Sequence, residues 1–224
     1  MMVIQKSILA CCIGWVTMIP PCGAHPHNWV TMRSEFVAND EGELIAVNQT
    51  WRFDFFFSAI LIAETVNEWQ QPLPKALEFE ARRMIQNLAP YQYFSVLLVN
   101  ERELQLPAPD HYALQVVKAE GQEFLELTMH FQMTQPTVLA GSTVSWSVYD
   151  PTYYIAYSHE HADNVTIRQA SNLSCSKQLK LPKLTEELIA YAFSLDQTER
   201  DTDGLGRAFA EKILIVCERQ GESR

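Results

Sequence analysis

The stretch WVTMRSEFVANDEGELIAVNQTWRF, residues 29–53, decides the fold of this chain of 224 residues. Residues 29–36 and 44–53 have the composition of β-strands. Between them, the run from Asn39 to Gly42 is typical of a tight turn. We therefore predict an antiparallel β-hairpin at the start of the folded body.

Beyond the hairpin, the hydrophobic pattern changes from strand-like to helix-like. Asp54 suits the N-cap of a helix that continues to about residue 69, and Pro74 suits the first turn of a second helix. Strand patterns return between residues 93 and 169, and helical patterns occupy residues 184–195 and 205–218. The predicted fold is α+β: an antiparallel β-sheet or sandwich with a helical insertion near residues 54–89 and a C-terminal helix pair.

Residues 1–24 have the layout of a signal peptide. Lys6 supplies a positive charge, residues 7–19 are mostly apolar, and the residues at positions 22 and 24 are small. The apolar stretch is shorter than the roughly 20 residues that a transmembrane helix needs. We therefore predict cleavage after Ala24, a periplasmic location and one mature domain, residues 25–224.

The charge of the chain excludes some classes of partner. Loss of residues 1–24 removes one charged side chain, Lys6, so the formal net charge goes from −10 to −11. Such a chain is a poor partner for nucleic acid or for an anionic membrane surface. We expect no nucleic-acid partner, and no stable membrane insertion once the signal peptide is removed.

Cleavage after Ala24 would make His25 the first residue of the mature protein. Its α-amine and Nδ1 could chelate one metal ion, and His27 faces the same side of an extended segment. Nitrogen ligands suit zinc, nickel and copper. Pro26 has no amide N–H, so a square-planar site built on deprotonated backbone nitrogens cannot form here. The alternative is that both histidines belong to an unordered tail.

Four other histidines and one aspartate are further candidates. His159 and His161 project from the same side of an extended segment, which is compatible either with chelation or with a solvated loop. Asp150 suits a turn between aromatic strands but could also be a ligand. His130 falls on the polar face of a strand and His111 in a predicted loop, and either could complete a metal site.

Two cysteines remain after residue 24, Cys175 and Cys217. An even count in an oxidising compartment favours one disulfide that stabilises the C-terminal region. A two-thiolate metal site would need further soft ligands, and no histidine lies between the two cysteines or beside them.

The chain resembles a family of bacterial periplasmic proteins whose mature sequence begins His-Pro-His and whose members accompany nickel, cobalt or zinc permeases. The matching pieces are HPHNWV at residues 25–30, WRFD at residues 51–54 and YDPTYY at residues 149–154, with Cys175 and Cys217 near the end. The resemblance implies a non-enzymatic accessory that captures zinc or nickel and delivers it to an inner-membrane permease. The expected metal ligands are His25, His27, His159, His161 and Asp150.

A copper protein is the alternative that the residues leave open. In a histidine-brace oxygenase, His25 and one distant histidine would hold a redox-active copper ion. The second imidazole would come from His111, His130 or His159, and His27 would then have no role. A copper-binding β-sandwich without catalysis is a third interpretation.

Overall fold

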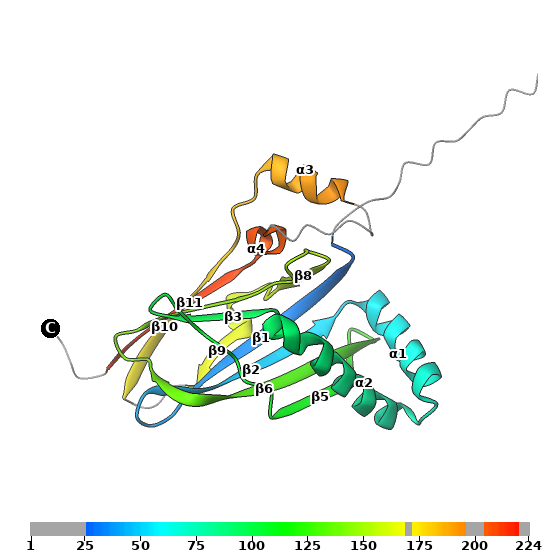
Figure 1. Cartoon of the computed structure of the whole chain (residues 1–224), viewed down its shortest axis with the longest axis horizontal. Coiled ribbons are helices and arrows are strands. Elements are labelled where there is room, and N and C mark those ends of the chain that lie inside the picture. Colours follow the sequence, from blue (N-terminus) through cyan, green and yellow to red (C-terminus); the bar gives the residue numbers. More distant parts are fainter. Residues whose placement is uncertain (1–25, 169–171, 196–203, 220–224) are drawn as a thin grey trace, which may run out of the picture.

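The computed structural model describes residues 26–168, 172–195 and 204–219, which form two β-sheets and several helices (Figure 1). The first sheet has the strand order β5-β6-β2-β1-β8, and β9 also pairs with β1. Its strands are β1 (Asn28–Ala38), β2 (Glu43–Phe53), β5 (His111–Ala119), β6 (Gln122–Val138), β8 (Ile155–Ser158) and β9 (Val165–Arg168). The second sheet has the order β10-β11-β7-β3-β4. Its strands are β3 (Ser95–Val99), β4 (Arg102–Leu104), β7 (Thr143–Val148), β10 (Leu173–Lys180) and β11 (Lys212–Arg219).

The helices are α1 (Phe55–Trp69), α2 (Leu73–Leu88), α3 (Glu186–Ser194) and α4 (Leu205–Phe209), with short 3₁₀ segments η1 (Ala89–Phe94) and η2 (Ala162–Asn164). Within the described ranges, none of the helices is both long enough and apolar enough to cross a membrane.

The predicted hairpin is confirmed as β1 and β2, which pair antiparallel from Val30 opposite Phe53 onward. Alternate residues of β1 are buried, among them Met32 and Phe36, while the residues between them face solvent or are half-buried. The Phe36 ring packs edge-on against Trp146 of β7, 5.8 Å between centroids. The core therefore lies between the two sheets, and the other face of the first sheet is open.

The predicted helical insertion is confirmed as α1 and α2, which pack against β6 and β5 (Figure 1). Asp54 caps α1 as expected, because its Oδ1 accepts a hydrogen bond from the Phe57 amide. The buried Ser58 hydroxyl accepts a hydrogen bond from the Leu125 amide and so ties α1 to β6. The helices thus extend the core beyond the edge of the second sheet.

The predicted C-terminal helix pair is right in its first member and wrong in most of its second. Helix α3 forms near residues 184–195, but α4 ends at Phe209 and β11 occupies Lys212–Arg219. Ile213, Ile215 and Cys217 are buried in alternation with more exposed residues, which is a period of two. Pairing with β10 on one side and β7 on the other outweighs the helical pattern. The predicted Cys175–Cys217 disulfide is confirmed and joins β10 to β11.

Candidate functional site

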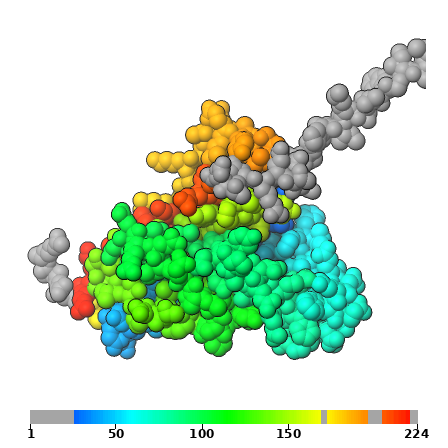
Figure 2. All heavy atoms as spheres, in the orientation of Figure 1, coloured from blue at the N-terminus to red at the C-terminus, as the bar shows by residue number. Residues whose placement is uncertain are grey.

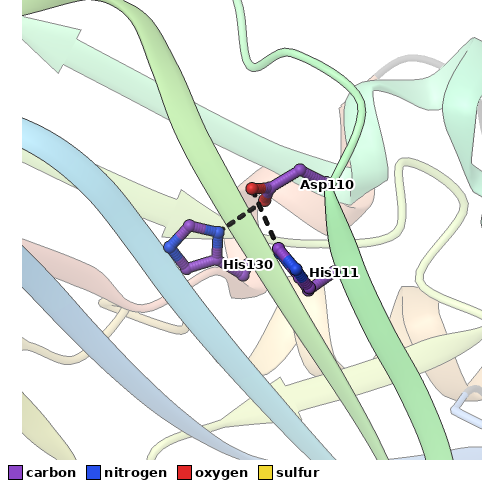
Figure 3. Close-up of side chains that lie close together, drawn as sticks. All are labelled: Asp110, His111 and His130. Carbon is purple, nitrogen blue, oxygen red and sulfur yellow. Dashed lines mark hydrogen bonds and ion pairs between the residues drawn. The ribbon is translucent and has the colours of Figure 1, made fainter.

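Asp110, His111 and His130 form a cluster at one edge of the first sheet (Figure 3). Strands β5 and β6 pair so that His111 lies opposite His130, and the Asp110 amide donates to the His130 carbonyl. The carboxylate of Asp110 lies between the two rings: Oδ1 is 2.5 Å from Nδ1 of His130, and Oδ2 is 3.1 Å from Nδ1 of His111. Two imidazoles and one carboxylate therefore face one small volume.

The arrangement has the chemistry of a metal site. One ligand atom from each residue lies within 4.8 Å of the other two. Ligands around zinc lie about 2.0–2.2 Å from the ion, so modest side-chain rotation would close the cluster on one ion. The hydrogen bond from His130 holds the pKa of Asp110 below its ordinary value, so the carboxylate is charged and attracts a cation.

The turn between β5 and β6 determines that His111 and His130 lie opposite each other. Glu120 and Gly121 both have positive φ, 53° and 78°, as a two-residue type I′ hairpin turn requires. Such a turn pairs Ala119 with Gln122, and counting outward from that pair brings His111 opposite His130. The sequence indicates the turn at Gly121, but the prediction that His111 lies in a loop is wrong, because β5 begins at His111.

A polar row crosses the open face of the first sheet and ends at the cluster. Glu35 on β1 lies opposite Asn48 on β2, and Asn48 lies opposite His130 on β6. The side-chain amide of Asn48 donates to Oε2 of Glu35 at 2.5 Å. His130 therefore lies on a regular, paired strand with polar neighbours, whereas Asp110 and His111 stand at the rim.

His159 occupies a different environment. Its ring is buried, with Nε2 2.8 Å from the Ser34 hydroxyl and Nδ1 2.9 Å from Oε2 of Glu211. Burial would raise the pKa of Glu211, but hydrogen bonds from His159 and Ser158 outweigh that effect and lower it. Both ring nitrogens of His159 are thus engaged, and a metal-ligand role would break one of these bonds.

The order Ser34, His159, Glu211 matches the hydrogen-bond pattern of a serine-hydrolase triad. Ser34 is only 1% exposed, however, and its hydroxyl also accepts a hydrogen bond from the Gln49 side-chain amide. A nucleophile must be reachable by its substrate. We therefore interpret this group as a buried polar network that joins β1 to the segments before η2 and β11.

His161, two residues on, is exposed and precedes η2. Its amide lies 2.5 Å from the His159 carbonyl, in a tight turn. The two imidazoles are therefore in different environments, one buried and one in solvent. The structure does not present His159 and His161 as a chelating pair.

His25 lies outside the described residues, but the surroundings of His27 are clear. The His27 amide donates to the Tyr154 carbonyl at 2.9 Å, and the two rings have centroids 4.8 Å apart. Strands β1 and β8 run parallel from this point, and His159 follows the end of β8. Tyr154 and His159 are five positions apart, with the four residues of β8 between them, which spans about 16 Å of extended chain. His27 and His159 therefore lie at opposite ends of β8.

Asp150 shapes the turn that holds Tyr154. Its Oδ1 accepts hydrogen bonds from the amide and hydroxyl of Thr152, and its Oδ2 accepts one from the Ile155 amide. Gly206 of α4 packs on this turn so closely that a Cβ there would lie 1.7 Å from the Asp150 carbonyl oxygen. Asp150 is therefore positioned as a turn-forming residue beside the segment that holds His27.

The start of β1 is also tied to α1. The Trp29 amide donates to Oδ2 of Asp54 at 3.2 Å, and the Asp54 amide donates to the Trp29 carbonyl at 2.9 Å. Three motifs far apart in the sequence, of which the structure describes residues 26–30, 51–54 and 149–154, thus meet where β1 begins. Asp54 and the turn at Asp150 both hold this first segment of the folded body.

The fold and the histidine cluster define an α+β protein of two sheets with a candidate metal centre on an open sheet edge. The chain matches, over residues 8–217, a family described as a protein of unknown function, DUF1007, and belongs to it. It is also similar to an uncharacterized protein of Haemophilus influenzae, with 29% identity over 203 residues, 87% of this chain and 92% of the relative. The resemblance seen in the motifs is confirmed at the level of the family, and the link to permeases stays a prediction.

Proposed function

We propose that this protein binds a divalent transition-metal ion at Asp110, His111 and His130. The observation that carries the proposal is the convergence of two imidazoles and one carboxylate within 4.8 Å. Imidazole and carboxylate ligands suit zinc, nickel and copper, so zinc or nickel is the proposed cargo and copper the competitor.

The exposure of the cluster supports exchange of the ion. His111 and Asp110 are exposed and His130 is half-buried, so a bound ion could be reached by another protein. Three protein ligands also leave one position of a tetrahedral zinc ion open, which a ligand from an acceptor could occupy. These features fit a carrier that releases its ion.

The cellular setting is part of the same proposal. The signal-peptide pattern of residues 1–24 supports export to the periplasm. The resemblance to proteins that accompany metal permeases supports delivery of the ion to an inner-membrane permease, without catalysis. His25 and His27 would form a separate amino-terminal site. The ordinary pKa of an α-amine is about 8, so this amine must lose a proton to bind the metal.

Titration calorimetry with zinc alone and with nickel alone tests the proposal, on protein that lacks residues 1–24. His130→Ala should weaken binding at the cluster at least about tenfold, the smallest loss typical even of an outer-shell partner. His161→Ala is the matched control, because His161 is an exposed histidine outside the cluster, and it should bind like the wild type. Equal affinity of the His130→Ala variant and the wild type would overturn the proposal.

The amino-terminal site needs its own comparison. A sample with one glycine added before His25 keeps both imidazoles but moves the free amine. This sample should no longer bind metal at the amino-terminal site, while binding at the cluster that contains His130 remains. If the added glycine abolished all binding, the cluster would not be the metal site.

A further inference from the structure

Large apolar side chains gather on the surface beside the start of β1. Trp29 is 56% exposed, and in the first turns of α1 Phe55 is 37%, Phe56 76% and Ile60 58% exposed. We call these four residues, together with Phe124 of β6, the aromatic patch. Single exposed apolar residues need no explanation, but contiguous ones mark an interaction site.

Ring contacts show that the patch is continuous. The Phe55 ring lies 5.5 Å from that of Phe56 and 6.3 Å from that of Phe124. The two hydrogen bonds between Trp29 and Asp54, one to the Asp54 carboxylate and one between backbone groups, place Trp29 directly beside the first residue of α1. The patch therefore spans β1, α1 and β6 at one end of the first sheet.

The first half of α1 contributes no charge to the patch, although the Arg52 guanidinium lies over the Phe124 ring, 5.5 Å from its centroid. Residues 55–63 read FFFSAILIA and contain no charged side chain; the one polar residue, Ser58, is buried. The first turn of α1 has no acidic residue, although acidic residues are favoured there. Figure 2 shows α1 at the surface, in cyan at the right-hand end of the molecule.

The chain that precedes the patch indicates what covers it. Residues 7–19 are the mostly apolar stretch, and residues 20–25 separate it from Pro26. Six residues span at most about 20 Å. While residues 7–19 are in a membrane, the start of β1 and the aromatic patch beside it are held close to the lipid surface.

We propose that the aromatic patch rests on the surface of a lipid bilayer, with Phe56 and Ile60 in the interfacial region. Aromatic and large aliphatic side chains favour this region of a membrane. The net charge of −10 gives no attraction to anionic lipid, so the contact is with the apolar part of a neutral bilayer. This inference does not depend on the metal site, which lies further along β6.

Sedimentation with phosphatidylcholine vesicles tests the inference, on protein that lacks residues 1–24 but retains every described residue. The wild type should sediment with the vesicles, and the double variant Phe56→Ser, Ile60→Ser should bind at least about tenfold more weakly, a loss of about 1.4 kcal/mol. Brominated lipid should quench Trp29 in the wild type and not in the double variant.

The matched control is Leu181→Ser, Phe193→Ser, which removes two exposed apolar side chains from outside the patch, 69% and 56% exposed. It should bind vesicles like the wild type. Substitution at exposed positions leaves the fold intact, which thermal unfolding checks. Failure of the wild type to sediment, or an equal loss in the control, would refute lipid binding. Dimerisation of the wild type that Phe56→Ser abolishes would show instead that a second copy covers the patch.

Discussion

Two histidine sites in this protein have nearly the same partners and opposite surroundings. His130 and His159 each place Nδ1 next to a carboxylate, at 2.5 Å from Asp110 and 2.9 Å from Glu211. The first pair lies on an open sheet edge with a second imidazole beside it, and the second is buried with a serine on the other ring nitrogen. The contrast teaches that a histidine's role depends on exposure and on cross-strand neighbours more than on local spacing.

Removal of the buried imidazole should have the largest effect on stability. His159→Ala removes one buried hydrogen-bond partner from Ser34 and the charged one from Glu211, so the free energy of unfolding should fall by about 3 kcal/mol. His130→Ala removes a half-buried side chain and should change it by less than about 0.5 kcal/mol. Urea unfolding measures both. Equal decreases in the free energy of unfolding in the two variants would show that the two histidines contribute equally to stability, contrary to this prediction.

A metal ion bound at the open site should stabilise the protein. With free zinc at about 100 times its dissociation constant, binding to the native state adds about 2.7 kcal/mol to the free energy of unfolding. Thermal melts with and without zinc should show this gain in the wild type and in His161→Ala. In His130→Ala, zinc should no longer increase the free energy of unfolding. If the increase remained in this variant, the stabilising ion would be bound at another site.

The turn that sets the register of the open site gives a smaller effect. A Cβ on Gly121 would meet no atom within 4 Å, so Gly121→Ala tests the backbone conformation alone. Because φ there is 78°, the substitution should cost about 1 kcal/mol in the free energy of unfolding and weaken zinc binding. Gly141 also has positive φ and an open Cβ position, so Gly141→Ala is the matched control. It should cost about as much in stability as Gly121→Ala, again about 1 kcal/mol, without weakening zinc binding.

The smallest expected effect is the dependence of stability on pH through Glu211. Its pKa in the folded protein lies below its ordinary value, so its charged form stabilises the fold at a pH above that ordinary value. The contribution is lost as the pH falls through the lower, folded pKa. Glu211→Gln should therefore flatten the acid limb of a plot of stability against pH, while Asp110→Asn, at an exposed position, should change that limb less. An unchanged acid limb in Glu211→Gln would contradict this assignment.

Local patterns predicted the fold well where neighbouring residues decide the structure. The hairpin turn at Asn39, the cap at Asp54 and the stripe of α2 are all local signals, and each is confirmed. Residues 212–219 carry an ambiguous apolar pattern, and the competing strand is stabilised by β7 and β10, which are distant in sequence. No local propensity includes that pairing energy.

The candidate site likewise depends partly on local sequence and partly on contacts between distant residues. The spacing of His159 and His161 is compatible with chelation or with a solvated loop, but in the structure one ring lies in the core and the other in solvent. His111 and His130 are nineteen residues apart in sequence, and only the register of β5 against β6 brings them together. The turn at Gly121 is enough to predict that register. No local pattern predicts that His159 is buried against Glu211, which is distant in the sequence.

The pairing of β1 also has a consequence for the order in which the chain can fold. Strand β1 pairs with β2, its neighbour in sequence, on one side, but on the other side with β8 and β9, which begin at residues 155 and 165. A chain that emerges from a channel amino-terminus first holds β1 with one open edge until more than a hundred further residues have followed. Long-range pairings of this kind form slowly. The topology therefore delays completion of the first sheet until β8 and β9 can pair with β1.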